Sequence, residues 1–115
     1  MRAIPDEKLY LSAVTLGELQ SGIEITREQD PIKAAALEAW LEQVSQTFNI
    51  LPMDGRTFRI WGQLLHRKPD ELIEDAMIGA TAVAHGLMVV TRNARDFTRL
   101  GIASFNPFTG KIVKP

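Results

Sequence analysis

Two aspartates, Asp75 and Asp96, stand where a fold could bring two carboxylates together. Asp75 lies near the start of a helical pattern, and Asp96 follows the apolar run Leu87 to Val90. Carboxylates about 5.5 Å apart repel each other by roughly 3 kcal/mol at an effective dielectric constant of 20, so a fold that gathers them usually stabilises them with a cation. Oxygen ligands with no His or Cys nearby select Mg²⁺ or Mn²⁺. The pair therefore suggests divalent-metal chemistry.

The segment 71–97 predicts the elements that would position these two residues. Apolar residues recur at three- and four-residue steps between positions 73 and 84, which predicts a helix, and Gly86 stands where a left-handed C-cap is usual. The run Leu87 to Val90 is long enough for a strand covered on both faces. A short helical turn is expected after Asp96. Because ligands of parallel α/β sheets lie outside the carboxyl ends of the strands, we expect Asp96 at such an edge, with Asp75 facing it.

The rest of the chain continues the alternation of strands and helices. Further short strands are expected at residues 9–14, 48–51 and 102–105, with a polar lead-in at 1–7 and a tail at 110–115 that is loose at its end. Helices are expected to start at Thr15, with Glu18 at capping-box spacing, at Asp30 before Pro31, and at Asp54. The helix after Asp30 is expected to bury a stripe made of Ile32, Ala35, Ala36, Ala39, Trp40 and Val44. This order predicts a single domain over residues 1–115, an α/β fold with three α/β/α layers around a parallel sheet.

Composition narrows the classes of function. The chain has 115 residues, 45% of them hydrophobic and 23% charged, as is ordinary for one globular domain. It has no cysteine, which excludes disulfides, thiol catalysis and cysteine-ligated zinc. No apolar run approaches the length of a membrane span, and the N-terminus lacks the order of a secretory signal. With a formal net charge of -1, any RNA binding needs a local basic patch or a partner.

Two motifs carry a resemblance to a known family. The segment Asp75-Ala-Met-Ile-Gly-Ala-Thr-Ala, followed by Val90-Thr-Arg-Asn-Ala-Arg-Asp-Phe, resembles the C-terminal half of a PIN-domain nuclease of the VapC and FitB type, a toxin of type II toxin–antitoxin systems. The segment from Leu9 to Leu19, followed by Gly22, is similar to the strand and helix that carry the family's first helical glutamate. Residues 51–54, 61–62 and 105–108 fit as well, so the resemblance covers almost all of the chain.

One segment of the family's pattern has no counterpart in this sequence. The family begins with a strand that ends in an Asp-Thr-Asn type motif, followed by a helix, and nothing of that kind precedes Ala3. In the family this strand is central and its Asp is a metal-binding carboxylate. The expectation is therefore a PIN-like domain that is N-terminally truncated relative to the family, with the first central strand missing. Losing one carboxylate removes a ligand and should weaken metal binding substantially.

The resemblance implies roles for particular residues. It implies that Glu18, Asp75 and Asp96 are the catalytic and metal-binding acids, with Mg²⁺ or Mn²⁺ as cofactor. Thr91 and Asn93 would support the site by hydrogen bonds, and Arg92 and Arg95 would orient the RNA backbone. The chain would then be an endoribonuclease toxin that cleaves RNA in the cytoplasm, forms a homodimer and is inhibited by a cognate antitoxin. The alternative is a non-catalytic PIN remnant that binds an antitoxin or another partner protein.

Each site residue also has a simpler interpretation. Glu18 could close a capping box with Thr15. Asp75 could favour the helix dipole together with Glu74. Asp96 could cap a short helix after Asn93 or pair with Arg99, and the two arginines could pair with the carboxylates. A flavodoxin-like binder of small molecules shares the expected architecture alone, and architecture does not determine function.

Overall fold

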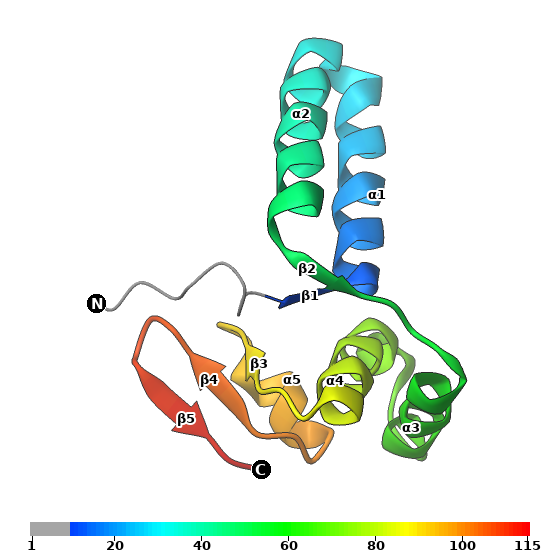
Figure 1. Ribbon diagram of the computed structural model, residues 1–115, viewed down its shortest axis with the longest axis vertical. Coiled ribbons are helices and arrows are strands. Elements are labelled where there is room, and N and C mark those ends of the chain that lie inside the picture. The colour runs from blue at the N-terminus through cyan, green and yellow to red at the C-terminus, as the bar shows by residue number, and fades with distance from the viewer. Residues whose placement is uncertain (1–9) are drawn as a thin grey trace. The chain divides into compact units, whose positions relative to one another are not determined.

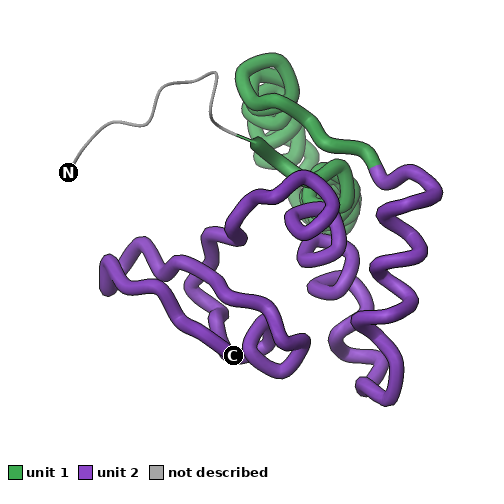
Figure 2. The backbone as a smooth tube through the Cα atoms, turned by 60° about the horizontal axis from the view of Figure 1, so that its bottom comes forward, with its two compact units in different colours: residues 1–52 green, residues 53–115 purple. Residues whose placement is uncertain are grey.

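The computed structural model describes residues 10–115, so the expected lead-in at 1–7 and the first strand residue, Leu9, lie outside the described residues. The elements in chain order are β1 (Tyr10–Ser12), α1 (Ala13–Gln29), α2 (Pro31–Thr47), β2 (Asn49–Leu51), α3 (Gly55–Leu65), a 3₁₀ turn (Asp70–Leu72), α4 (Ile73–His85), β3 (Val89–Val90), α5 (Ala94–Arg99), β4 (Ser104–Asn106) and β5 (Lys111–Val113) (Figure 1). The chain divides into two compact units, 1–52 and 53–115 (Figure 2). That these units form a single domain stays a prediction.

The first unit is a helical hairpin joined to a parallel strand pair. Strands β1 and β2 run parallel, with Leu11 opposite Ile50. Helices α1 and α2 lie side by side (Figure 1). Their core contains buried and partly buried apolar side chains: Ile23, Ala34, Leu41, Leu16, Leu19, Leu37 and Val44. The hairpin therefore has a core of its own.

The prediction of which residues α2 buries is wrong for every member of the expected stripe except Val44. Ile32 is 85% exposed and Trp40 is 49% exposed, whereas Ala34 and Leu41 are buried. An alanine-rich helix offers two apolar stripes about one residue apart. The leucines of α1 select the stripe with the larger aliphatic side chains, because those bury more apolar area. Packing against a partner helix thus overrides the pattern along the helix itself.

Three helix starts test the capping predictions. Asp30 Oδ1 accepts a hydrogen bond from the Lys33 amide at 3.0 Å, and Asp54 Oδ1 accepts one from the Thr57 amide at 2.9 Å, so both predicted caps are confirmed. The predicted cap at Thr15 is wrong. Helix α1 begins at Ala13, and Ser12 Oγ accepts from the Val14 amide at 3.2 Å. Because a serine already caps this end, Thr15 lies inside the first turn, and the capping-box interpretation of Glu18 loses its basis.

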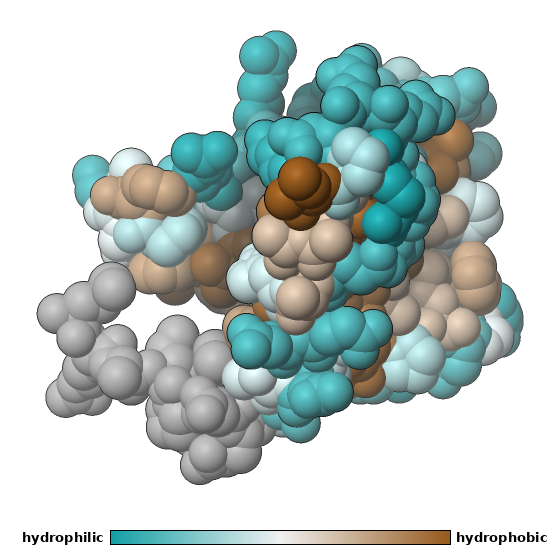
Figure 3. Space-filling model, turned by 90° about the horizontal axis from the view of Figure 1, so that it is seen from above, coloured by the Kyte–Doolittle hydropathy of each residue, from teal (hydrophilic) through white to brown (hydrophobic). Residues whose placement is uncertain are grey.

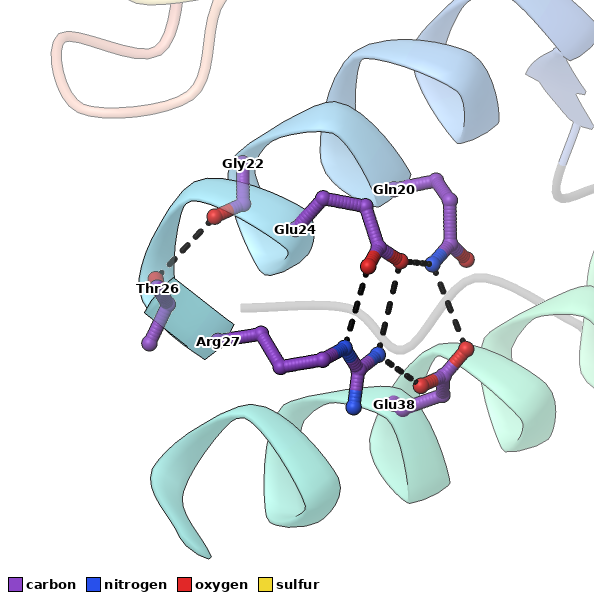
Figure 4. Close-up of polar contacts among 6 residues, drawn as sticks. All are labelled: Gln20, Gly22, Glu24, Thr26, Arg27 and Glu38. Carbon is purple, nitrogen blue, oxygen red and sulfur yellow. Dashed lines mark hydrogen bonds and ion pairs between the residues drawn. The ribbon is translucent and has the colours of Figure 1, made fainter. Parts of the chain in front are cut away.

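A polar cluster joins α1 to α2 (Figure 4). Arg27 Nε donates to Glu24 Oε1 at 3.0 Å, and its Nη2 forms an ion pair with Glu38. Gln20 Nε2 donates to Glu24 at 2.7 Å and to Glu38 at 3.2 Å. The contact with Arg27, followed by that with Gln20, holds the pKa of Glu24 below its ordinary value. Glu24 is exposed and the other three residues are half-buried, and ion pairs this open to solvent contribute little to stability.

The second unit packs its helices around a separate core. Buried residues from the 3₁₀ turn, α4, β3, α5 and the segment after α5 form this core, and they are Leu72, Ala76, Ala82, Val89, Phe97, Leu100 and Ile102. From α3, Trp61 packs against it and donates Nε1–H to the Ile73 carbonyl at 3.2 Å. Gly86 has φ 65° and ends α4 as the predicted left-handed C-cap. Helix α4 itself begins at Ile73, after the 3₁₀ turn that follows Pro69.

The strands of the second unit correct three expectations. The strand β3 contains only Val89 and Val90, and Val90 is 62% exposed, so the run from Leu87 is not covered on both faces. The strand β4 spans 104–106 rather than 102–105. Residues 111–113 of the expected tail form a strand, because Gly110 turns the chain at φ 69° and β5 pairs antiparallel with β4. Strands β3 and β4 run parallel, and the predicted α/β class is confirmed.

Hydrophobic residues also occur on the surface. The face drawn in Figure 3 is mostly hydrophilic, with smaller hydrophobic groups between. Single exposed apolar residues of this kind are normal for a globular protein. Within residues 10–115, no helix is long and apolar enough to cross a membrane.

Candidate functional site

Asp75 and Asp96 lie together in the second unit. Asp75 is in the first turn of α4 and Asp96 is in the first turn of α5, rather than before that helix as expected. Burial, the negative charge of Asp96 and a hydrogen bond between the two side chains raise the pKa of Asp75, with a smaller contribution from Glu74. The two carboxyl groups therefore face each other, as their places in the sequence predicted.

Hydrogen bonds orient Asp96 from both sides. Asn93 Nδ2 donates to Asp96 Oδ2 at 2.7 Å, and Arg99 Nη1 contacts Asp96 Oδ1 at 3.4 Å. Arg99 Nη1 also pairs with Glu71 Oε1 at 2.8 Å, and this pair is the main cause of the raised pKa of Arg99. The Asn93 amide donates to Thr91 Oγ1 at 3.0 Å. The turn after β3 thus holds a polar side chain against the acidic pair.

The basic residues near the pair have different surroundings. Arg99 is the arginine that binds Asp96, which was the simpler alternative for that aspartate. Arg92 and Arg95 form no ion pair with any acidic side chain among residues 10–115. The guanidinium carbon of Arg92 instead lies 5.2 Å from the centre of the Phe108 ring. No motif in the sequence assigned a separate role to Phe108.

Gly79 lets α4 approach the elements that follow it. A Cβ at Gly79 would clash with the δ-methyl of Ile102, so that methyl would have to move. The same Cβ would make an ordinary contact with the Phe97 ring at 3.8 Å. Both neighbours are buried. Phe97 follows Asp96, so the close approach at Gly79 helps to hold Asp96 near Asp75. A glycine inside an otherwise helical pattern was the sequence signal for this contact.

Glu18 lies in the other unit, exposed on the second turn of α1. Its membership of one metal site with Asp75 and Asp96 stays a prediction. In the described part of the chain, no group of three His, Cys, Asp or Glu side chains is arranged to hold a metal ion. Asp75 and Asp96 nevertheless offer the oxygen ligands that Mg²⁺ and Mn²⁺ prefer, so the donor set fits either ion.

The chain is similar to known proteins along most of its length. The sequence profile of the PIN domain matches residues 1–103. The VapC ribonuclease Y4jK of Sinorhizobium fredii is 34% identical, and the match covers 89% of this chain and 76% of that protein. Toxin FitB of Neisseria gonorrhoeae is also 34% identical, with 89% of this chain and 77% of that protein covered.

Two solved structures have a similar fold. The crystal structure of FitAcB from Neisseria gonorrhoeae contains a chain with a TM-score of 0.79 and 34% identity, and the match covers 91% of this chain and 79% of that one. The structure of FitAB bound to the IR36 DNA fragment gives a TM-score of 0.77 at 31% identity, over 91% of this chain and 77% of that one. Motifs, fold and similarity agree: the chain belongs to the PIN-domain family and has relatives of the VapC and FitB type.

Proposed function

We propose that this chain is a divalent-metal-dependent endoribonuclease, the toxin of a type II toxin–antitoxin pair. Relatives named as VapC ribonucleases and as a toxin support this activity. The observation that carries the proposal is the facing pair of Asp75 and Asp96, in which burial and mutual repulsion raise the pKa of Asp75. Carboxyl groups whose pKa is raised by burial and by a neighbouring carboxylate are typical of functional sites.

The pair would hold Mg²⁺ or Mn²⁺ through its carboxylate oxygens, with Glu18 as the third acid. A bound ion of this kind polarises a phosphate oxygen and lowers the pKa of its water. The other roles fall to side chains of this protein. Asn93 keeps one oxygen of Asp96 oriented, and Arg99 offsets part of the negative charge. Arg92 and Arg95 would contact the RNA backbone, because neither is committed to an acidic partner among the described residues.

The same relatives indicate which protein partner to expect. The solved neighbours are described as FitAB and FitAcB, and this supports an antitoxin as the protein partner of the present chain. We further propose that the chain forms a homodimer and acts in the cytoplasm, where its RNA substrate is found.

A second candidate function is a non-catalytic PIN domain that binds the antitoxin or another protein. The observation that favours it is that, within residues 53–115, no third His, Cys, Asp or Glu side chain joins Asp75 and Asp96 in a group that could hold a metal ion. Two carboxylates alone give a weak site for Mg²⁺, which usually also keeps several waters. Cleavage assays separate the two candidates.

The test uses the purified 115-residue chain with labelled single-stranded RNA. We expect cleavage with Mg²⁺ or Mn²⁺ and none with EDTA. Asp75→Asn and Asp96→Asn should each slow cleavage by about 100-fold or more, in the range found when one stabilising group is removed from an active site. Glu74→Gln is the matched control, since Glu74 adjoins Asp75 but is exposed, and it should cleave normally.

Two outcomes would change the assignment. Unchanged cleavage by Asp75→Asn and Asp96→Asn would show that the metal site lies elsewhere. A wild-type chain that binds neither metal nor RNA, yet unfolds cooperatively, would leave the non-catalytic candidate.

A further inference from the structure

The carboxyl edge of the parallel strands presents an aromatic ring paired with an arginine. Strands β3 and β4 run in the same direction, and the Thr91 amide extends their ladder by donating to the Phe105 carbonyl at 3.0 Å. The segments that leave the two strands therefore start from one edge. They bring the Arg92 guanidinium to 5.2 Å from the centre of the Phe108 ring.

The turn that carries Phe108 is ordered by its own hydrogen bonds. Asn106 Oδ1 accepts from the Phe108 amide at 2.9 Å, and the Asn106 carbonyl accepts from the Gly110 amide at 2.9 Å. Pro107 restricts the backbone between them. Phe108 is nevertheless 73% exposed, so the fold holds an aromatic ring in solvent with Arg92 on one side. The ring is thus free to receive a flat ligand.

The surroundings of this ring are basic. Among residues 10–115, Arg92 and Lys111 make no ion pair with an acidic side chain. Lys111 pairs with Asn106 across the hairpin, beside the turn that carries Phe108. The whole chain has a formal charge of only -1, so this local group of cations supplies attraction for an anion that the net charge does not.

The arginine that contacts the ring lies close along the chain to Asp96 of the candidate catalytic pair. Arg92 directly precedes Asn93, so their Cα atoms are about 3.8 Å apart. The Asn93 side chain holds Asp96 at 2.7 Å. Arg92 is therefore the chain neighbour of the residue that holds Asp96.

We propose that Phe108 and Arg92 form a nucleotide-binding contact, in which the ring stacks on an unpaired base and the guanidinium binds the adjacent phosphate. This inference rests on the proposed ribonuclease function and adds that Phe108 binds a base of the substrate. Base stacking on exposed aromatic side chains, with cations along the backbone, is the general way in which proteins bind single strands.

The experiment measures binding of a fluorescein-labelled single-stranded RNA of about 12 nucleotides by anisotropy, in EDTA to prevent cleavage. Phe108→Ala should weaken binding about 5- to 100-fold, and Phe108→Trp should restore it, since stacking requires an aromatic ring rather than this particular one. Arg92→Ala should make the affinity less dependent on salt, because one phosphate contact is lost. Phe108→Ala should keep the salt dependence of the wild type.

Phe58→Ala is the matched control. Phe58 is an exposed phenylalanine of the same unit, 46% exposed, but it lies on α3 and contacts Trp61 rather than an arginine. Its replacement should leave RNA binding unchanged. A double-stranded RNA of the same length should not distinguish Phe108→Ala from wild type, because its bases are not available for stacking.

The outcomes separate this inference from the function on which it rests. If wild type binds and cleaves RNA, and Phe108→Ala binds the single strand equally well, the proposed stacking contact is wrong. The exposed Phe108 ring would then be a candidate contact for a protein partner instead. If wild type neither binds nor cleaves RNA, the ribonuclease function fails first and the contact fails with it.

Discussion

The carboxyl group of Asp96 on α5 helps to hold the pKa of Asp75 on α4 above its ordinary value. Asp96 is held in this position by Asn93 and Arg99, so the repulsion is built into the fold. A protein that keeps two acids together in this way gives up stability at neutral pH. This relationship leads to predictions for stability as well as for catalysis.

Without metal, replacing Asp75 should stabilise the protein. Because the folded pKa of Asp75 is raised above the ordinary 3.8, the folded state becomes less favourable as the pH rises from about that value through the folded pKa. Asp75→Asn should therefore increase the free energy of unfolding at pH 7 by up to about 1 kcal/mol, limited by solvent screening, and change nothing at pH 3. Urea unfolding in EDTA at several pH values measures this. Glu74→Gln should give a smaller gain, and an Asp75→Asn variant less stable than wild type at pH 7 would contradict the prediction.

Binding of a divalent metal should offset the loss of stability that the Asp75–Asp96 repulsion causes. Mg²⁺ or Mn²⁺ that binds only the folded state raises its stability by about 2.7 kcal/mol at a free concentration one hundred times the dissociation constant. Thermal unfolding and calorimetry should show this effect in wild type, and Asp75→Asn and Asp96→Asn should greatly reduce it. Glu42→Gln, an exposed change on α2, serves as the control. A metal-induced shift of the same size in the aspartate variants would place the ion elsewhere.

Gly79→Ala should destabilise the second unit although alanine favours helices. The new Cβ would displace the δ-methyl of the buried Ile102, and such overpacking costs about 1–3 kcal/mol against a helix-propensity gain of about 1 kcal/mol. Ile102→Val removes that methyl, at a cost of about 0.5–1.5 kcal/mol by itself. In the Ile102→Val background, Gly79→Ala should be neutral or stabilising. A double-mutant cycle from urea unfolding tests this, and purely additive effects would rule out the close contact.

Two buried serines should respond in opposite ways to alanine. Ser104 Oγ in β4 is buried without a hydrogen-bond partner among the described residues, so Ser104→Ala should be neutral or slightly stabilising. Ser12 is also buried, but it caps α1 through the Val14 amide, and Ser12→Ala should cost about 1 kcal/mol. Denaturation midpoints compare the two variants directly. A larger loss from Ser104→Ala than from Ser12→Ala would mean that the Ser104 hydroxyl has a partner.

Features that depend on neighbours along the chain could be predicted from the order of the amino acids. Asp30 and Asp54 bind amides three residues ahead, and Gly86 adopts its left-handed conformation within a single turn, so local patterns were enough to predict them. The order of elements also placed Asp75 and Asp96 opposite each other. That order constrains a parallel α/β unit because its connections are short and have one hand.

Features that depend on contacts between distant residues could not be predicted from local patterns. Which stripe of α2 is buried depends on the leucines of α1, and whether residues 111–113 form a strand depends on the edge of β4. Gly79 matters only because Ile102 lies against it, and Phe108 matters only because Arg92 reaches its ring. Hydrophobic periodicity and residue type do not predict which distant side chains come into contact. Those contacts depend on how the side chains of the whole unit pack together.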